Sequence, residues 1–208
     1  CKIVSFDYSQ IELRLAAEIS QDNNFINAFV ADEDIHSSTA KEIFNIKDKD
    51  LNSAHRRRAK TINFGILYGI SPYGLAKQLS ISNSEAKQYI ENYFKRFPKI
   101  RDYMDYQINY AKTNNYVETM FGRRCNIQGI NDKNFAVRGF AERQSINAPI
   151  QGTAADIIKL SMIEIHKNIK EKKIKAKMLL QVHDELVFEI AESKIKESIP
   201  LIKNIMEK

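Results

Sequence analysis

The sequence predicts an α+β protein that is mostly helical and contains a small antiparallel sheet. Helical periodicity covers most of the 208 residues, and only a few short apolar runs indicate strands. Two of these runs, near opposite ends of the chain, end or turn at an aspartate. With 43% apolar and 28% charged residues, the composition is that of a globular protein and excludes collagen-like, low-complexity and disordered classes.

The elements are expected in the following order. A buried strand covers 3–7, and helices cover 10–19, the segment that Asp22 caps, and the segment from Asp34 to Phe44. After a solvated connection at 47–50, a helix begins at Ser53 and ends at Gly69. Further helices are expected at 84–97, 99–114, 133–147, 151–170 and from 193 onward, with hairpins at 116–130 and 176–190.

An aromatic stripe follows the two helices on either side of Pro98. Its spacing is helical, and we interpret it as core and interhelix packing. The stripe consists of Tyr89, Tyr93, Phe94, Phe97, Tyr103 and Tyr106.

Charge is distributed unevenly along the chain, whose formal net charge is +6. Residues 1–55 carry 5 basic and 10 acidic side chains, whereas residues 56–124 carry 13 basic and 5 acidic ones. An acidic start and a basic middle fit a protein that binds metal in one region and phosphates in another; an ordinary basic surface is the alternative.

Two cysteines, Cys1 and Cys125, cannot form a disulfide framework, which favours a reducing, cytoplasmic setting. The sequence contains no apolar run long enough for a transmembrane helix and no signal peptide. Because it lacks an initial Met and begins inside an expected strand, we expect it to be a piece of a longer chain.

Asp7 and Asp184 each lie where an apolar strand ends or turns. Side by side in one sheet, they would form a carboxylate pair able to hold hard divalent cations. Either aspartate taken alone could equally serve a turn.

Arg56, Lys60, Phe64 and Tyr68 recur every four residues and therefore share one helix face. Such a stripe suits a nucleoside triphosphate, with the cations at the phosphates and Phe64 against the base. An amphipathic helix with snorkelling cations is the alternative. Arg57 is expected to lie off this stripe.

A second stripe of the same spacing, Arg143, Asn147 and Gln151, offers hydrogen bonds to base edges, sugars or phosphates of a duplex. Pro149 is expected to bend the backbone between its two helices.

Three long motifs, in this order, resemble those of the family A DNA polymerases. Asp7-Tyr8-Ser9-Gln10-Ile11-Glu12-Leu13-Arg14 resembles motif A, the run from Arg56 through Lys60 and Phe64 to Tyr68-Gly69 resembles motif B, and Gln181-Val182-His183-Asp184-Glu185 resembles motif C. Shorter segments between them are similar too, so the resemblance covers nearly the whole chain. Phe6 departs from the smaller residue expected before motif A, which affects local packing.

The resemblance implies a role for each matching residue. Asp7, Asp184 and the backbone carbonyl of Tyr8 would bind two Mg²⁺ ions, and Lys60 would protonate the departing pyrophosphate. The residues implied in binding the incoming dNTP are Gln10, Glu12, His36, Arg56, Lys60, Phe64 and Tyr68, with Tyr68 linked to Glu12. Those implied in binding primer-template DNA are Arg143, Asn147, Gln151, His183 and Glu185.

The resemblance also implies a right-hand architecture. Residues 1–14 and 141–208 would form parts of the palm, and 15–140 the helical fingers inserted between them, with thumb and exonuclease domains outside this segment. The implied activity is template-directed DNA synthesis by a monomer in the bacterial cytoplasm, near the nucleoid. We expect the segment alone to be inactive.

Three other functions compete with this interpretation. A single-subunit RNA polymerase shares the order of the motifs, but Glu12 would obstruct a ribose 2′-hydroxyl. A non-catalytic nucleic-acid-binding module would have no use for both aspartates together with Lys60 and Tyr68. A metal-dependent nuclease would need three or four clustered carboxylates, whereas only two are evident, with Glu185 as an uncertain neighbour.

Overall fold

The computed structural model describes all residues from Cys1 to Lys208, and the chain divides into two compact units. Unit 1 comprises Cys1–Glu12 and Gln151–Lys208, and unit 2 comprises Leu13–Ile150. The helices are α1 (Ile11–Ser20), α2 (Asn23–Val30), α3 (Ile35–Ile43), α4 (Ser53–Leu67), α5 (Pro72–Leu79), α6 (Asn83–Arg96), α7 (Pro98–Asn114), α8 (Phe135–Lys170) and α9 (Ile195–Met206). The strands are β1 (Lys2–Asp7), β2 (Tyr116–Glu118), β3 (Arg124–Asn126), β4 (Ala176–Val182) and β5 (Glu185–Ile190), and short 3₁₀ helices cover Asp48–Asp50 and Glu192–Lys194.

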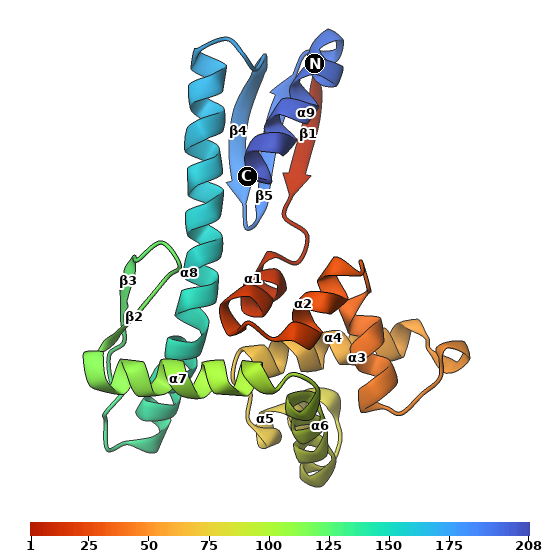
Figure 1. The fold of residues 1–208 in the computed structure, drawn as a ribbon, viewed down its shortest axis with the longest axis vertical. Helices are drawn as coiled ribbons and strands as arrows, with labels where there is room; N and C mark the ends of the chain where they lie inside the picture. The colour runs from red at the N-terminus through yellow and green to blue at the C-terminus, as the bar shows by residue number, and fades with distance from the viewer. The chain divides into compact units, whose positions relative to one another are not determined.

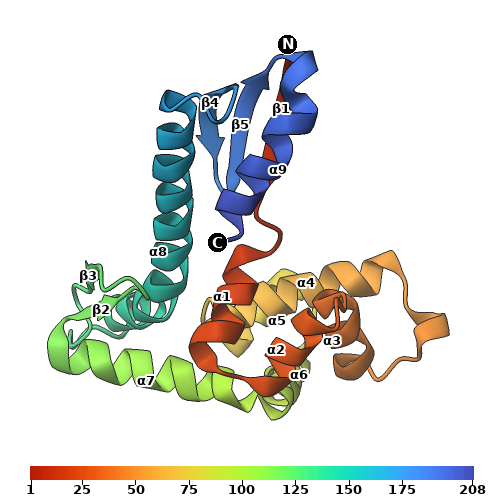
Figure 2. The ribbon, with the colours of Figure 1, turned by 45° about the horizontal axis from the view of Figure 1, so that its top comes forward.

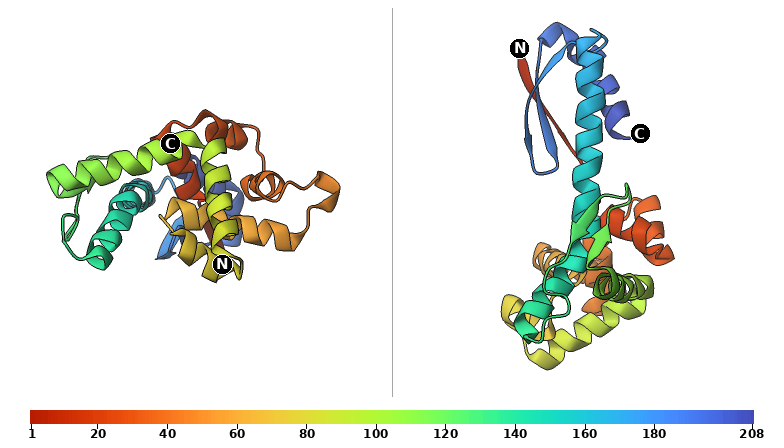
Figure 3. Two further views of the ribbon diagram at one scale, coloured as in Figure 1. Left: turned by 90° about the horizontal axis from the view of Figure 1, so that it is seen from below. Right: turned by 90° about the vertical axis from the view of Figure 1, so that its left-hand side faces the viewer.

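Unit 1 is a three-stranded antiparallel sheet in the order β1-β5-β4 (Figure 1). Alternate residues of β1 and β5 point to opposite faces, as the pleat requires. Val4 and Phe6 of β1 and Phe188 of β5 point into the core, where α8 and α9 cover one face of the sheet (Figure 3, right). Asp7 therefore points to the other face, opposite Glu185 in the register.

Unit 2 is helical apart from the β2–β3 hairpin (Figure 2). Phe25 of α2 and Tyr93 of α6 pack against Phe97, with ring centroids 4.7 and 5.0 Å from it. The Asp22 carboxylate caps α2 by accepting from Phe25 N and also accepts from Lys99 N at the start of α7. This carboxylate thus joins the N-terminal turns of two helices.

Most expected elements are confirmed, including the strands at both ends of the chain and the caps at Asp22 and Asp34. The strand at 3–7 was expected to be buried, but only one of its faces packs on the core, and Ile3 on the other face is 65% exposed. The aromatic stripe is only partly core, because Tyr93, Phe97 and Tyr103 are buried whereas Tyr106 is 60% exposed.

Helix α5 was not expected from the sequence. Ser71 caps it by accepting from Gly74 N, and Pro72 occupies its first turn. A proline at this position needs no hydrogen bond from its nitrogen and has a helical φ, so Ser71-Pro72 begins a helix here.

The prediction of two helices separated near Pro149 was wrong, because α8 is continuous from Phe135 to Lys170. Proline removes one backbone donor from the helix interior. Ile146 and Ile150 are buried around this turn, and the Tyr103 hydroxyl donates to the Ile146 carbonyl at 2.7 Å. Packing and this added hydrogen bond hold the helix together across the proline. No helix of the chain is both long and apolar enough to span a bilayer.

Gly69 ends the turn after α4 with a positive φ of 74°. A Cβ atom built there would lie 3.2 Å from Arg143 Cγ and 3.3 Å from Ile146 Cδ1, both on α8. The glycine is therefore required both by the backbone conformation and by the close approach of α8.

We expect Gly69→Ala to lower the free energy of unfolding more than Gly122→Ala does. Gly122 has nearly the same φ, 76°, but no atom within 4 Å of a built Cβ. In each variant, the strain of alanine in a left-handed backbone conformation should lower the free energy of unfolding by about 1–2 kcal/mol. Only Gly69→Ala should lower it further, because the added Cβ also contacts α8. Urea unfolding of both variants measures the difference; equal losses would contradict the packing role.

Candidate active-site residues in the two units

The end of the sheet in unit 1 brings Asp7 and Asp184 together. Asp7 is the last residue of β1, and Asp184 lies in the two-residue turn between β4 and β5. Tyr8 N donates to the Asp184 carbonyl at 3.2 Å, which fixes the chain after β1 to this turn. The turn is made possible by His183, whose φ is 53°. Residues 177 positions apart in the sequence are thereby placed at one sheet end.

The electrostatics of this sheet end are those of crowded carboxylates. Burial and the charges of Asp184 and Glu185 raise the pKa of Asp7. Burial and the charge of Asp184 also raise the pKa of Glu12, in the first turn of α1. Neighbouring like charges destabilise one another, so a cation would be bound favourably here.

The donor set fits Mg²⁺ that is shared with a phosphate-bearing ligand. The chain has no group of three or more His, Cys, Asp and Glu side chains arranged to hold a metal. Mg²⁺ is commonly bound through one or two carboxylates, with substrate phosphates and waters completing the octahedron. Asp7 and Asp184 supply that number of carboxylates, and their mutual repulsion is the feature that a cation would relieve.

Tyr8 is held in place through both its side chain and its backbone. Its hydroxyl donates to the Met206 carbonyl of α9 at 2.7 Å and lies 2.7 Å from Ser161 Oγ of α8. Burial raises the pKa of this hydroxyl. The backbone beside Asp7 is thus held by the two helices that cover the sheet.

Three further expected residues of unit 1 lie in or near this region. Gln10 precedes α1 with a φ of 55°, and its side-chain Oε1 is buried without a hydrogen bond. His183 is exposed in the turn, and its carbonyl accepts from Gln181 Nε2 at 2.9 Å. Glu185 accepts a hydrogen bond from the Ser5 hydroxyl, which draws it toward β1.

In unit 2, one face of α4 lines a cavity of about 530 Å³. Lys60, Phe64 and Tyr68 all face it, as their spacing predicts. Lys60 Nζ lies 5.9 Å from the centroid of the Phe64 ring, and the Phe64 and Tyr68 centroids are 5.9 Å apart. The other lining residues are Arg57, Thr61, Gly65, Ile70, Gln78 and Arg143.

Arg56 and Arg57 differ from the sequence expectation. Arg57 was expected off the stripe but lines the cavity, whereas Arg56 does not. The Arg56 guanidinium instead pairs with Asp34, with Nε 2.5 Å from Oδ2. Although burial alone would raise it, the pKa of Asp34 is held at about 2 by hydrogen bonds from Arg56 and Ser37. A carboxylate that caps α3 thereby also fixes the first turn of α4.

His36, the second residue of α3, packs against α4 and is 2% exposed. Its Nδ1 is 2.9 Å from Asn63 Nδ2, and its ring centroid is 5.7 Å from that of Phe64. Burial and the positive charges of Arg56 and Lys60 lower the pKa of His36 to about 4, against the opposing charge of Asp34. His36 is therefore a neutral imidazole at physiological pH.

The three residues of the second stripe follow one another on α8. Arg143 lines the same cavity as Lys60 and Phe64, so the structure joins the two stripes at this point in unit 2. Asn147 Oδ1 is buried without a hydrogen bond. Gln151 is exposed and is the first residue of α8 that belongs to unit 1.

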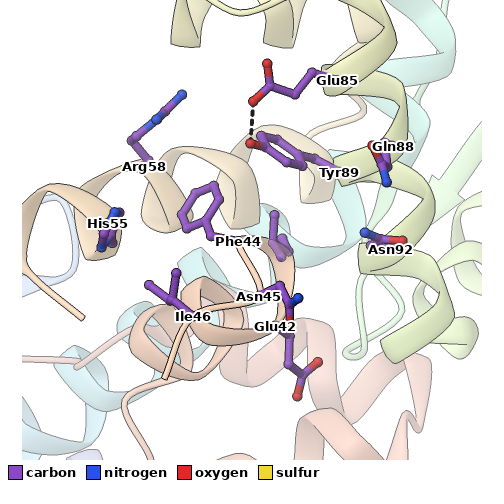
Figure 4. Close-up of a pocket in the computed structure, with 11 residues that line it drawn as sticks. Glu42, Phe44, Asn45, Ile46, His55, Arg58, Glu85, Gln88, Tyr89 and Asn92 are labelled. Atoms are coloured by element: carbon purple, nitrogen blue, oxygen red, sulfur yellow. Dashed lines mark hydrogen bonds between the residues drawn. The ribbon is translucent and has the colours of Figure 1, made fainter. Parts of the chain in front are cut away.

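A larger cavity, of about 710 Å³, lies among α3, α4 and α6 (Figure 4). Its charged lining residues already pair within the protein. Glu85 accepts from the Tyr89 hydroxyl at 2.5 Å, Glu42 binds Arg96 at 3.1 Å, and the Arg58 guanidinium lies 5.6 Å from the Phe44 ring centroid. These contacts join three helices, and we assign the cavity a structural role.

Sequence reasoning missed three participants in the α4 region. Asp34 was recognised only as a helix cap, and neither Asn63 nor Gln78 was singled out. Asn63 is fully buried within α4, and a buried amide in a helix interior indicates a specific polar partner. Gln78 lies on α5, the helix that was not expected.

Comparison with known proteins gives concordant matches along the whole chain. The sequence model of DNA polymerase family A matches residues 1–208. DNA polymerase I of Streptococcus pneumoniae serotype 4 is 50% identical over 206 residues, which are 99% of this chain and 24% of that protein. DNA polymerase I of Geobacillus stearothermophilus is 47% identical over 205 residues, or 99% of this chain and 23% of that protein.

A solved structure is similar as well. It is the POL domain of Pol1 from M. smegmatis in complex with DNA primer-template and dNTP, with a TM-score of 0.94 and 43% identity. The match covers 99% of this chain and 36% of that chain. The chain thus spans about a quarter of the length of the curated relatives that it matches.

We expect Asp7→Asn to stabilise the fold at pH 8 and to have no effect near pH 3. The pKa of Asp7 is raised in the folded state, so wild-type stability falls as the pH rises past about 4 and the carboxylate ionises. Melting temperatures across this pH range, in buffer without divalent cations, measure the difference. Asp105→Asn, at an exposed position of α7, controls for the loss of one charge; equal behaviour of the two variants would contradict the repulsion.

Proposed function

The chain belongs to DNA polymerase family A, and we propose on that basis that it carries out template-directed DNA synthesis. In this reaction, deoxynucleotides from dNTPs are added to a primer 3′-hydroxyl and pyrophosphate is released. The observation that carries the proposal is the pair of crowded carboxylates, Asp7 and Asp184, at the end of a sheet. The experiment that tests it is primer extension by variants of these two aspartates, in a polymerase chain that contains residues 1–208.

In this proposal, Asp7, Asp184 and the backbone carbonyl of Tyr8 hold two Mg²⁺ ions. Such ions, when bound, favour ionisation of the primer hydroxyl and stabilise the charge that develops at the α-phosphate. The protein's own contribution is to hold the two carboxylates in place. The Tyr8 anchors to α8 and α9 and the backbone hydrogen bond from Tyr8 to Asp184 supply that rigidity.

We propose that the α4 face binds the incoming dNTP. Lys60 and Arg56 would hold the triphosphate, and Lys60 would donate a proton to the departing pyrophosphate. Phe64 would pack against the sugar and base, and Tyr68 would lie at the templating position. The support is the shared cavity, in which a cation is followed by two aromatic rings along one helix face.

We assign preference for deoxyribose to Glu12, with Gln10 and His36 also contacting the nucleotide. A carboxylate beneath the sugar would obstruct a 2′-hydroxyl, which distinguishes this function from that of an RNA polymerase. Arg143, Asn147, Gln151, His183 and Glu185 would contact primer-template DNA. Arg143 has the strongest support, because it lines the same cavity as Lys60.

We propose that residues 1–14 and 141–208 are palm segments and that 15–140 form the fingers. The protein would act as a monomer on DNA in the bacterial cytoplasm. Residues 1–208 alone would extend primers poorly, since β1 and β4 leave two sheet edges unpaired and the phosphate contacts would come only from the basic middle of the chain and the second stripe.

Replacing either aspartate should abolish nucleotide addition and spare DNA binding. For Asp7→Ala and Asp184→Ala, we expect the extension rate to fall at least about 100-fold, or about 2.7 kcal/mol in barrier. Mg²⁺ alone should raise the melting temperature of the wild type and not that of the variants. Extension at near wild-type rates by either variant would overturn the assignment.

Lys60→Ala should slow the chemical step and weaken dNTP binding, each readable in single-nucleotide insertion kinetics. Arg58 is the matched control on the same helix, because it lies over Phe44 in the other cavity. We expect a loss of at least about 100-fold for Lys60→Ala and less than about threefold for Arg58→Ala. Equal losses, or an effect of Lys60→Ala on melting temperature only, would favour an amphipathic helix with snorkelling cations.

A further inference from the structure

The contact between His36 and Asn63 joins two buried polar side chains of unit 2. His36 is 2% exposed and Asn63 is fully buried. Asn63 Nδ2 lies 2.9 Å from His36 Nδ1, and Asn63 Oδ1 has no hydrogen-bond partner. The amide therefore has a single side-chain partner, which is the imidazole.

The chemistry of this contact determines the protonation of the ring. An amide nitrogen has no lone pair available to accept, so Asn63 is the donor and His36 Nδ1 the acceptor. The single proton of a neutral imidazole must then be on Nε2. An imidazolium would direct a second N–H at the amide N–H group, so the contact also disfavours the charged ring.

Burial is the main cause that lowers the pKa of His36, and the charged groups around the ring act in both directions. Arg56 and Lys60 of α4 face the ring and disfavour a positive charge, whereas Asp34 at the start of α3 opposes them. Asp34 is itself engaged by Arg56, at 2.5 Å. With burial added, the pKa of His36 is lowered to about 4.

We propose that Asn63 is a positioning residue, which fixes His36 as a neutral imidazole that donates from Nε2 to the incoming nucleotide. This inference rests on the proposed function, because it assigns His36 a substrate contact. His36 is near the groups that would hold the triphosphate, since its ring packs on Phe64 and both Arg56 and Lys60 act on it.

The consequence is a hydrogen bond to the nucleotide that does not depend on pH. A histidine of ordinary pKa would change its charge between pH 6 and 7, and its interaction with phosphate would change too. A ring held neutral, with its proton on Nε2, donates equally well throughout the neutral range. Arg56 and Lys60 then supply the positive charge, and His36 supplies a directional hydrogen bond that orients the nucleotide.

Asn63→Asp is the diagnostic variant, because it exchanges the donor for an acceptor of nearly the same shape. A carboxylate would accept a proton from Nδ1, so the neutral ring would present a bare Nε2 lone pair to the nucleotide. In acid, the imidazolium would regain the Nε2–H and bind phosphate well. The KM for dNTP should therefore rise with pH in Asn63→Asp by about fivefold from pH 6 to 8.5, the effect of about one hydrogen bond.

Over the same pH range, the wild-type KM should change less than about twofold. His36→Gln/Asn63→Asp is the control, and without the imidazole its KM should lose the added pH dependence. Asn63→Leu removes the hydrogen bond without supplying an acceptor, so its KM should be raised equally at all pH values.

A spectroscopic readout needs no nucleotide. In protein labelled with ¹⁵N-histidine, the wild-type His36 should show a protonated Nε2 and an unprotonated Nδ1 at pH 7, and Asn63→Asp should show a protonated Nδ1. A wild-type ring protonated at Nδ1, or a KM in Asn63→Asp that is independent of pH, would overturn the inference. If a wild-type polymerase chain that contains residues 1–208 does not extend primers, the proposed function fails, while the ¹⁵N result still tests the assignment of the proton.

Discussion

Electrostatic repulsion between Asp7 and Asp184 is the constraint on which the chemistry of unit 1 depends. Two carboxylates are held close only because β1 and β5 are paired in register and the backbone of Tyr8 donates to Asp184. The fold supplies the required rigidity from outside the site. The Tyr8 hydroxyl is bound to α8 and α9, and Phe6 packs edge-on against Phe188 at 5.5 Å in the core below. The unfavourable contact is thereby supported by favourable burial on the opposite face of the sheet.

In unit 2, the carboxylate that caps α3 also binds a residue proposed to contact the substrate. Asp34 caps α3 through the backbone of His36, and it pairs with Arg56 of α4. His36 in turn contacts Asn63 and packs on Phe64. Because each of these side chains has a partner on the other helix, α3 and α4 cannot shift relative to one another without breaking a buried or charged contact. The contacts with α3 thus hold α4, and with it the face that carries Lys60, Phe64 and Tyr68, in a fixed position.

The sequence determined those features that depend on residues near one another along the chain. The short apolar runs at 3–7 and 186–190 indicate strands, and the aspartates at 22 and 34 specify where helices begin. The four-residue spacing of Lys60, Phe64 and Tyr68 specifies a common face. Local geometry suffices in these cases, because the period of a helix or a strand is fixed by the backbone.

Tertiary structure alone decided which partner each polar side chain meets. Arg56 was expected to face the nucleotide site with Lys60, yet a carboxylate 22 residues earlier engages it and it does not line the cavity. Arg57 does line the cavity, but here the error was one of local geometry, because residues three and seven positions apart also share a helix face. Likewise, Pro149 indicates a break in any isolated helix, but buried Ile146 and Ile150 and the Tyr103 hydroxyl keep α8 continuous. The tautomer of His36 depends on an amide 27 residues away. Such contacts join residues that are distant in sequence, and their energies exceed the local preferences from which a sequence can be interpreted.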